Sequence, residues 1–315
     1  MSATVRVAVC SRSFSRNPVL RTELLARYPH VTFNDAGLQL NGDSLVEFLK
    51  GHDKAITALE TIDASVLSRL PELKVISKYG VGLDMIDMAA MRDYGKRLGW
   101  TAGVNRRSVS ELVISFAIAM LRHVPEANLE VRSGTWRQHA GGLLTGRTVG
   151  IIGCGHVGKD LVLLLKAFGC SILAHDILDF PDFYAAHGVE PVSLDTLLAR
   201  ADVVTLHVPL DDITRGMLDA RRLALLKPTA VLINAARGEL VDEAALKQLL
   251  QSKRLAAAAF DVFAVEPPQD QELLSLPNFL ATPHIGGSAA EAILAMGRAA
   301  INGLDKNDIP SHANG

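Results

Sequence analysis

Residues 147–176 read RTVGIIGCGHVGKDLVLLLKAFGCSILAHD, and this stretch decides the fold of the chain. Its first apolar run, TVGII, is typical of a buried strand. Three glycines follow as G-x-G-x-x-G, namely Gly153, Gly155 and Gly158, and they open a helix. A second apolar run, SILAH, leads to Asp176. Strand, glycine turn, helix and strand in this order predict a parallel βαβ unit.

The glycines and the terminal acid suggest a ligand for this unit. The first glycine permits a tight turn, the second lets the backbone approach a pyrophosphate, and the third allows close packing of helix on strand. The helix N-terminus adds amide donors and a positive dipole. A carboxylate at Asp176 can accept hydrogen bonds from both ribose hydroxyls and would repel a 2′-phosphate. A glycine-rich turn alone also occurs in unrelated α/β proteins, but these features together predict a dinucleotide site.

The neighbours of Asp176 favour NAD as the cofactor. His175 and Ile177 occupy positions where a protein that binds the 2′-phosphate of NADP more often has Arg or Ser. We therefore predict NAD, while a mixed preference stays open.

Short β-rich runs alternate with helical stretches along the whole chain. The predicted strands are Val5–Cys10, Lys54–Leu59, Lys74–Ser77, Thr148–Ile152, Ser171–His175, Val203–His207, Ala230–Ile233 and Leu255–Phe260. Helix signals lie between them: Asp63 opens DASVLSRL, and Asp87 opens DMAAMRDYG with Gly95 as its stop. This alternation predicts an α/β protein built from doubly wound parallel sheets.

We predict two domains, of which the first is discontinuous. A glycine-containing turn at 100–105 leads into a long apolar helix over 108–122, and the glycine motif begins only afterwards. If the nucleotide unit is central and its last strand ends near Thr282, a helix over 288–302 is free to return to the N-terminal part. The predicted ranges are 1–101 and 285–315 for the first domain and 102–284 for the central domain.

The composition argues against several classes of protein. The 315 residues are 49% hydrophobic and 21% charged, with a net charge of −2. This balance offers no basic surface to a nucleic acid or an anionic membrane. The longest apolar run, Leu112–Leu121, is too short for a bilayer, and the N-terminus lacks the apolar segment of an export signal. The polar tail after Gly303 is expected to fray.

The cysteines indicate a reducing compartment. The chain has three, Cys10, Cys154 and Cys170, which are too few for a disulfide framework and lack the spacing of a metal site. We therefore predict a cytoplasmic protein without a metal ion, a membrane anchor or a nucleic-acid partner.

Three segments, NAARG, FDVFAVEPP and TPHIGG, follow predicted strands, where open α/β sheets bind ligands. Arg237 has a planar fork that can grip a carboxylate and polarise an adjacent keto oxygen. His284 can exchange a proton near neutral pH, and Glu266 can fix its tautomer if the two side chains meet. Taken singly, each is more often an ordinary solvated residue. Beside a dinucleotide they predict hydride transfer to and from a small keto acid.

The motifs also resemble those of a known family. KYGVGLDMID, NRRSVSEL, GIIGCGHVGKDL, HVPL, INAARGELVDEAAL, AFDVFAVEP and TPHIGGS occur in order over nearly the whole chain. On these motifs the chain resembles the D-isomer-specific 2-hydroxyacid dehydrogenases, especially the phosphoglycerate dehydrogenase-like members. The resemblance implies a Rossmann NAD-binding domain inserted into a flavodoxin-like substrate domain. It implies reversible hydride transfer between nicotinamide C4 and C2 of a small 2-hydroxy or 2-keto acid.

The resemblance assigns a role to each motif residue. It places the catalytic residues at Arg237, Glu266 and His284. It implies cofactor contacts at Gly153, Gly155, His156, Val157, Gly158, Asp176, His207, Pro209, Ala235, Ala236, Asp261, Gly286 and Gly287. It implies substrate contacts at Lys78, Val81, Gly82, Arg237 and His284.

Some of these roles can be stated in more detail. By resemblance, the amides of His156 and Val157 face the pyrophosphate, and Asp261 holds the nicotinamide carboxamide. The amides of Val81 and Gly82 would face the substrate carboxylate, and the glycines of GVG would let these donors come close. The substrate would then lie between the domains, whose closure would exclude water.

The resemblance also bears on assembly and regulation. The helix after Asn105 and the segment around Trp136 would form a homodimer interface, although an apolar helix can equally belong to a monomer core. Since the sequence ends at Gly315, we expect no C-terminal serine-sensing domain of the kind found in some phosphoglycerate dehydrogenases.

Several readings stay open at the level of sequence. The substrate can be of the phosphoglycerate, glycerate/hydroxypyruvate or lactate type. Lys78 and the pair Arg106–Arg107 fit a dianionic acid, or are simply solvated charges. Corepressors that resemble this family use the same fold as NAD(H)-sensing dimers, and phosphite dehydrogenases keep the same three catalytic residues. Formate dehydrogenases have Gln in place of the catalytic Glu, so Glu266 argues against them.

Overall fold

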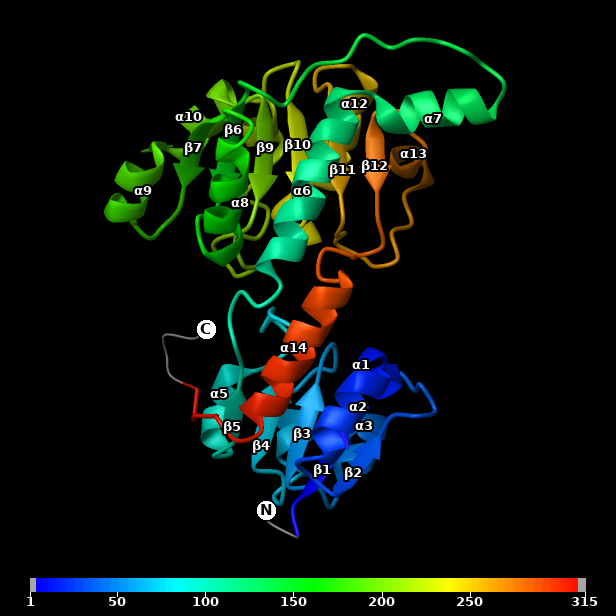
Figure 1. Cartoon of the computed structure of the whole chain (residues 1–315), viewed down its shortest axis with the longest axis vertical. Helices are drawn as coiled ribbons and strands as arrows, with labels where there is room; N and C mark the ends of the chain where they lie inside the picture. Colours follow the sequence, from blue (N-terminus) through cyan, green and yellow to red (C-terminus); the bar gives the residue numbers. More distant parts are fainter. Residues whose placement is uncertain (1–3, 311–315) are drawn as a thin grey trace. The chain divides into compact units, whose positions relative to one another are not determined.

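A computed structural model describes residues 4–310 and shows two compact units (Figure 1). Unit 1 consists of the chain up to Asn105 and from Ala289 onward, and unit 2 consists of Arg106–Ser288. The chain passes from one unit to the other at 105/106 and at 288/289, in each case four residues beyond the predicted boundary at 101/102 or 284/285. The displacement has a simple cause: the helix that opens unit 2 begins at Arg106, and the helix that returns to unit 1 begins at Ala290.

Unit 1 contains a five-stranded parallel sheet in the order β2-β1-β3-β4-β5. Its strands are β1 (Arg6–Val9), β2 (His30–Phe33), β3 (Lys54–Thr57), β4 (Val75–Lys78) and β5 (Arg97–Gly99). Its helices are α1 (Arg12–Arg16), α2 (Pro18–Leu25), α3 (Gly42–Leu49), α4 (Ala64–Leu67), α5 (Met88–Asp93) and α14 (Ala290–Gly303). The order 2-1-3-4-5 is the flavodoxin-like one, as predicted.

Unit 2 contains a seven-stranded parallel sheet in the order β12-β11-β10-β9-β6-β7-β8. Its strands are β6 (Thr148–Ile152), β7 (Ser171–His175), β8 (Val189–Pro191), β9 (Val203–Leu206), β10 (Val231–Asn234), β11 (Ala257–Phe260) and β12 (Phe279–Ala281). Its helices are α6 (Arg106–Leu121), α7 (Val124–Arg132), α8 (His156–Lys166), α9 (Pro181–His187), α10 (Leu194–Arg200), α11 (Ala220–Leu223), α12 (Glu243–Gln251) and α13 (Gln271–Leu274). Renumbered within the unit, the strand order is the Rossmann order 3-2-1-4-5-6 with one strand added.

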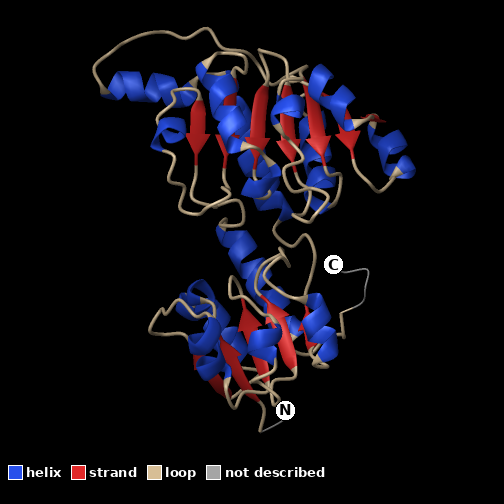
Figure 2. Ribbon diagram, turned by 180° about the vertical axis from the view of Figure 1, so that it is seen from behind, coloured by secondary structure: helices blue, strands red, loops and turns tan. Residues whose placement is uncertain are grey.

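Successive residues of the central strands belong to two different cores, one on each face of the sheet. In β6, Ile151 packs in one core and Ile152 in the other, and in β9 the same holds for Val203 and Val204. Strand side chains alternate between the two faces, so both faces must be covered. Figure 2 shows helices on both sides of the sheet. The doubly wound α/β prediction is confirmed.

Helix α6 belongs to the core of unit 2 along one face. Its buried residues include Val109, Val113, Phe116, Ala117 and Met120, which recur at helical spacing. On that face, the helix therefore belongs to the core of a single chain, which is one of the two alternatives that the sequence left open.

Two predicted helix caps are confirmed. The Asp63 side chain accepts a hydrogen bond from the backbone N–H of Val66, and Asp87 does the same for Ala90. Each carboxylate satisfies an amide that has no partner within its helix. Gly95 follows α5 with φ of 63°, a conformation that suits glycine.

The strand predictions missed sheet edges. Strands β2, β5 and β8 were not predicted, and β12 was anticipated only by its end near Thr282; all four lie at the edges of their sheets. Edge strands are covered less completely, as the alternation of exposed and half-covered residues in β2 shows. They therefore lack the continuous apolar run by which the central strands were found.

The prediction that the tail frays after Gly303 is wrong for the described part of it. Leu304 is fully buried, and Asp308 exchanges backbone hydrogen bonds with Leu98 of β5, at 2.8 and 3.2 Å. Arg97 adds a hydrogen bond from Nε to Asn307 Oδ1 of 2.6 Å. Polar side chains predicted fraying, but the backbone of this segment pairs with an edge strand. Residues 311–315 lie outside the described part.

In residues 4–310, no single helix has the length and apolar character needed to cross a membrane; α6 and α7 meet that criterion only as a pair, bent by 64°.

Candidate active site

The three predicted reacting residues follow three neighbouring strands of unit 2. Arg237 follows β10, Glu266 follows β11 and His284 follows β12. These strands are parallel neighbours, so all three residues leave the carboxyl edge of one sheet. Nδ1 of His284 lies 3.0 Å from Oε2 of Glu266. The structure thus forms the carboxylate–imidazole pair on which the sequence argument depended.

His284 is held by its backbone in an unusual conformation. Its φ of 55° lies in the left-handed region, which is uncommon for a residue with a side chain. Its N–H donates to the carbonyl of Asp261 at 2.9 Å. Backbone strain of this kind costs about 1–3 kcal/mol and persists only where surrounding contacts impose it.

Asp261 supplies those contacts. Its carboxylate is buried and accepts hydrogen bonds from the N–H of Ile285 at 2.8 Å and of Gly286 at 2.7 Å. The hydroxyl of Thr282 donates to it as well, at 2.5 Å. Its oxygens are thus bonded to the turn that carries His284. In the structure, Asp261 therefore positions the turn that carries His284. Its contact with the nicotinamide stays a prediction.

Glu266 uses its two carboxylate oxygens differently. Oε1 accepts a hydrogen bond from the N–H of Phe263 at 3.2 Å, while Oε2 faces His284. The side chains of both Glu266 and His284 are more than 40% exposed, so solvent or a ligand can reach them. Because Nδ1 is engaged with the carboxylate, Nε2 is the ring nitrogen that can exchange a proton with a substrate.

Arg237 is positioned through its turn. Buried Asn234 donates from Nδ2 to the Arg237 carbonyl at 2.8 Å and accepts from the Ala236 N–H at 3.1 Å. A Cβ on Gly238 would lie 1.9 Å from the carbonyl carbon of Phe263. The turn of Arg237 therefore packs backbone to backbone on the loop that leads to Glu266.

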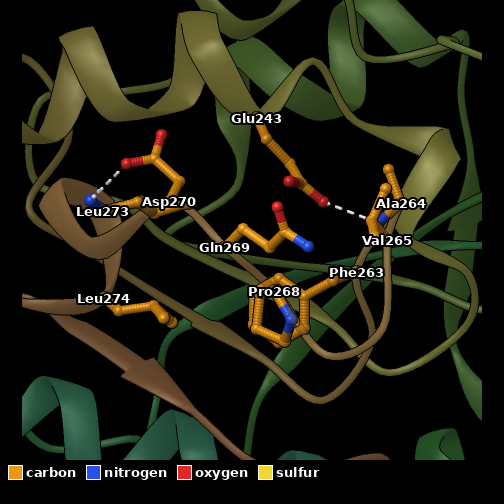
Figure 3. A pocket seen from close by; sticks show the side chains of 9 residues that line it. All are labelled: Glu243, Phe263, Ala264, Val265, Pro268, Gln269, Asp270, Leu273 and Leu274. Carbon is orange, nitrogen blue, oxygen red and sulfur yellow. Dashed lines mark hydrogen bonds between the residues drawn. The ribbon is translucent and has the colours of Figure 1, made fainter.

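A small cleft lies beside the same loop. It encloses about 210 Å³ and is lined by Glu243, Phe263, Ala264, Val265, Pro268, Gln269, Asp270, Leu273 and Leu274 (Figure 3). Glu243 accepts a hydrogen bond from the Ala264 N–H at 2.8 Å, and burial raises the pKa of its carboxyl. None of the three predicted catalytic residues lines this cleft. Its visible contribution is the Glu243 contact that braces the loop before Glu266.

The glycine loop has the geometry of a phosphate site. Gly153 has φ of 94°, and a Cβ there would lie 2.7 Å from the carbonyl carbon of His207. A Cβ on Gly158 would lie 2.3 Å from the carbonyl oxygen of Gly153. Gly155, in contrast, has no atom within 4 Å of an added Cβ, and it caps the N-terminus of α8. Gly153 and Gly158 thus close the turn, and Gly155 leaves room for a ligand at the positive end of helix α8. These residues fit the pyrophosphate of a dinucleotide.

Asp176 directly follows β7, as predicted, and it also contacts the glycine loop. Its Oδ2 accepts a hydrogen bond from the Cys154 N–H at 2.6 Å, and its Oδ1 accepts one from Leu178 N–H at 2.9 Å. The sequence suggested a ribose acceptor but not this second task. Asp176 ties the second strand to the turn between Gly153 and Gly155.

His207 follows β9 and is uncharged near neutral pH. Burial lowers the pKa of its imidazole to about 3, and its Nε2 lies 3.0 Å from the hydroxyl of Thr205. Its backbone is the surface against which Gly153 packs. The residue therefore brings a neutral ring, not a cation, to the predicted cofactor site.

The other predicted cofactor residues of unit 2 lie past the carboxyl ends of its strands. They are His156 and Val157 in the first turn of α8, Pro209 after β9, Ala235 and Ala236 after β10, and Gly286 and Gly287 after β12. In an open α/β sheet this edge is where ligands bind.

The predicted substrate residues of unit 1 surround the end of β4. Gly80 has φ of 132°, and the Val81 carbonyl accepts a hydrogen bond from Trp100 Nε1 at 2.9 Å, which holds the turn that contains Gly82. Lys78 is only 5% exposed and donates to the carbonyl of Ala58. A substrate contact by Lys78 stays a prediction.

Arg107 was suggested either as a site for a dianionic acid or as a solvated charge. Its side chain is 55% exposed, and its guanidinium also forms two hydrogen bonds of 2.9 Å to the carboxylate of buried Asp160. This pair links the start of α6 to α8. Such bidentate pairs are fixed in geometry, so Asp160 holds the Arg107 guanidinium in place.

Comparison with known proteins adds to this geometry. Residues 114–286 match the NAD-binding domain of the D-isomer specific 2-hydroxyacid dehydrogenases, which covers more than half of the chain. The chain belongs to this family. The resemblance noted in the sequence is thereby confirmed, as is NAD as the cofactor of the family's domain.

The named relatives of this chain differ in substrate. It is 38% identical over 239 residues to the D-3-phosphoglycerate dehydrogenase of Mycobacterium tuberculosis (strain ATCC 25618 / H37Rv), a match that covers 75% of this chain and 45% of that protein. It is 37% identical over 263 residues to the hydroxypyruvate reductase of Thermotoga maritima, covering 80% and 84% of the two chains. The TT0316 protein from Thermus thermophilus has the same fold, with a TM-score of 0.83, 32% identity and coverage of 98% and 99%. The chain spans about half the length of the phosphoglycerate dehydrogenases it matches.

Substitution Asp176→Asn tests how this chain selects its cofactor. The amide keeps an acceptor for the Cys154 N–H but removes the charge that repels a 2′-phosphate. We expect the ratio of kcat/KM for NADH over NADPH to fall roughly 10- to 100-fold, since each tenfold step corresponds to about 1.4 kcal/mol. Steady-state kinetics with both cofactors measures the ratio. An unchanged ratio in a folded variant would refute the assigned contact with the ribose.

Proposed function

We propose that this chain is an NAD-dependent D-2-hydroxyacid dehydrogenase that interconverts a small 2-hydroxy acid and the matching 2-keto acid. The observation that carries the proposal is the pair of Glu266 and His284, with 3.0 Å between Oε2 and Nδ1, at the carboxyl edge of the sheet that also carries the glycine loop. The names of the mycobacterial and Thermotoga relatives support the substrate class.

The residues of the chain divide the work of keto-acid reduction as follows. NAD, when bound in its reduced form, supplies the hydride that reaches C2 of the keto acid. His284 donates the proton from Nε2 to the 2-oxygen, and in the reverse direction it removes that proton. Glu266 stabilises the imidazolium through Nδ1 and keeps the ring in the tautomer that this transfer needs.

Arg237 orients the substrate in this proposal. Its guanidinium would bind the carboxylate and polarise the keto oxygen, because a planar fork with several donors matches both groups. In unit 1, we assign Lys78 and the amides of Val81 and Gly82 to the substrate as well. In unit 2, the N-terminus of α8 would hold the pyrophosphate, and the Asp176 carboxylate would bind the ribose.

We further infer a cytoplasmic homodimer without a membrane or nucleic-acid partner. The net charge of −2 supports the absence of a nucleic-acid partner. Helix α7 has no buried residue, and it exposes Leu129 and Val131, with Trp136 just beyond it 85% exposed. Large exposed apolar side chains in one segment support the dimer that the family resemblance implies.

A panel of four keto acids tests the proposed activity. Purified protein is assayed for NADH consumption with hydroxypyruvate, glyoxylate, pyruvate and 3-phosphohydroxypyruvate. We expect at least one to turn over with kcat of roughly 1–1,000 s⁻¹, the usual range for enzymes. The fluorescence of bound NADH is titrated in parallel. Tight NADH binding without turnover on any of the four acids would contradict the dehydrogenase and favour an NAD(H)-sensing protein.

A further inference from the structure

A cluster of potential metal ligands lies at the start of α7 and in the loop that follows it, far in sequence from the predicted catalytic residues. The cluster consists of His123, Glu126 and His139, whose ligand atoms all lie within 4.8 Å of one another. Figure 1 shows α7 and the long loop that returns from it to β6. His139 comes from this loop, while His123 and Glu126 belong to the beginning of the helix.

The spacing of the three atoms leaves room for a small cation. Nδ1 of His123 lies 3.9 Å from Oε2 of Glu126, and Nδ1 of His139 lies 3.8 Å from the same oxygen. Both separations are too long for hydrogen bonds. Ligand bonds of about 2.0–2.1 Å in a tetrahedral zinc site place neighbouring ligand atoms roughly 3.3 Å apart. The two separations from Glu126 would shorten by about half an ångström in such a site, and the ligand atoms of the two histidines lie within 4.8 Å of each other.

A second carboxylate prepares His139 as a ligand. Its Nε2 lies 2.7 Å from Oε2 of Glu130, so in a neutral imidazole Nε2 would carry the proton and Nδ1 would offer its lone pair to a metal ion. Nδ1 lies 3.8 Å from Oε2 of Glu126. A carboxylate on the far nitrogen is the usual support of a metal-bound histidine, because it fixes the ring and raises its basicity.

The charges of the cluster suit a divalent cation. Arg137 lies 3.3 Å from Oε1 of Glu126 and also contacts Oε1 of Glu130. It bonds the Oε1 atoms of both carboxylates and, through Nε at 3.3 Å, also Oε2 of Glu130, whereas Oε2 of Glu126 faces the two histidines. With neutral imidazoles, two carboxylates and one guanidinium carry a net charge of −1, which a divalent ion would offset.

The backbone and ring geometry hold His123 toward the cluster. This residue precedes α7 with φ of 55°, a left-handed conformation that costs free energy in a residue with a side chain. Its ring stacks on that of His139, with centroids 5.6 Å apart. The strained residue thus contributes to the same group of three side chains.

We propose that His123, Glu126 and His139 bind a divalent transition metal ion, with Zn²⁺ as the best match and a fourth position for water. Two imidazoles and one carboxylate favour such ions over Mg²⁺ and Ca²⁺, which prefer oxygen ligands. The ion would fasten the loop over residues 133–147 to the start of α7. The proposal departs from the sequence-based prediction of no metal, which considered only cysteine spacing.

Cobalt binding tests the site directly on the full chain without a histidine tag. We expect one Co²⁺ per chain, with the visible absorption of tetrahedral Co²⁺, and displacement by one equivalent of Zn²⁺. His139→Gln should abolish this absorption. Glu130→Gln should weaken binding by about 10- to 100-fold, as is usual when the partner of a ligand histidine is removed. His30→Gln, at an exposed histidine of unit 1, is the matched control and should bind as the wild type does.

Equal Co²⁺ absorption in His139→Gln and wild type, or no tetrahedral Co²⁺ signal in the wild type, would overturn the proposal. Circular dichroism confirms that each variant is folded.

Discussion

Replacement of His284 by Gln is expected to lower kcat by about 100- to 10,000-fold, the usual contribution of a general acid or base. Glutamine retains a hydrogen-bonding amide near Glu266 but has no group that can release a proton near neutral pH. Affinity for NADH should change little, because the His284 side chain is not among the predicted dinucleotide contacts. Stopped-flow or steady-state oxidation of NADH, together with a fluorescence titration, separates the two effects.

The partner of His284 provides the control for this experiment. Glu266→Gln should reduce kcat less than His284→Gln does, since the imidazole remains but loses a charged support. The double variant should be no slower than His284→Gln alone, because residues that act as a unit are strongly non-additive. A kcat within a few-fold of wild type in His284→Gln would remove this residue from the mechanism.

Gly158→Ala is the second change with a large expected effect. The added methyl would lie 2.3 Å from the carbonyl oxygen of Gly153 and 3.2 Å from Cγ2 of Ile151. The first contact is with backbone, so helix α8 must move away from the loop. We expect destabilisation of about 1–3 kcal/mol, as for other overpacked sites. We also expect NADH affinity to fall by roughly 100-fold or more, because the amides of α8 would leave the pyrophosphate.

Gly155→Ala is the matched control for Gly158→Ala. No atom lies within 4 Å of its added Cβ and its φ is −75°, so the free protein should keep its stability. A bound pyrophosphate would meet the methyl, so affinity for NADH should still fall. Thermal unfolding and NADH titration of both variants give the comparison. Wild-type NADH affinity in both variants would show that the dinucleotide does not bind at this loop.

Much of the fold could be predicted because the central strands are buried on both faces. Strands β6 and β7 begin and end where TVGII and SILAH predicted, since the runs on either side of the glycines are apolar and short. The caps at Asp63 and Asp87 were equally local, because each carboxylate binds an amide three residues away. Edge strands such as β2 and the pairing of Asp308 with Leu98 were not local. They depend on which backbone lies beside them in space.

For the candidate site, too, local features could be predicted from the sequence and contacts between distant residues could not. The sequence by itself determined which residue types stand at the carboxyl ends of the strands of unit 2, and it determined the glycine turn, because both follow from local pattern. Only the tertiary structure decided that Glu266 reaches Nδ1 of His284, that Asp261 holds the His284 turn, and that Asp176 binds the Cys154 amide. The same is true of the cluster of His123, Glu126 and His139. The physical reason is that hydrogen bonds and metal sites act over about 2–3 Å, whereas these partners come from separate turns whose distances are set by the packing of the sheet and helices beneath them.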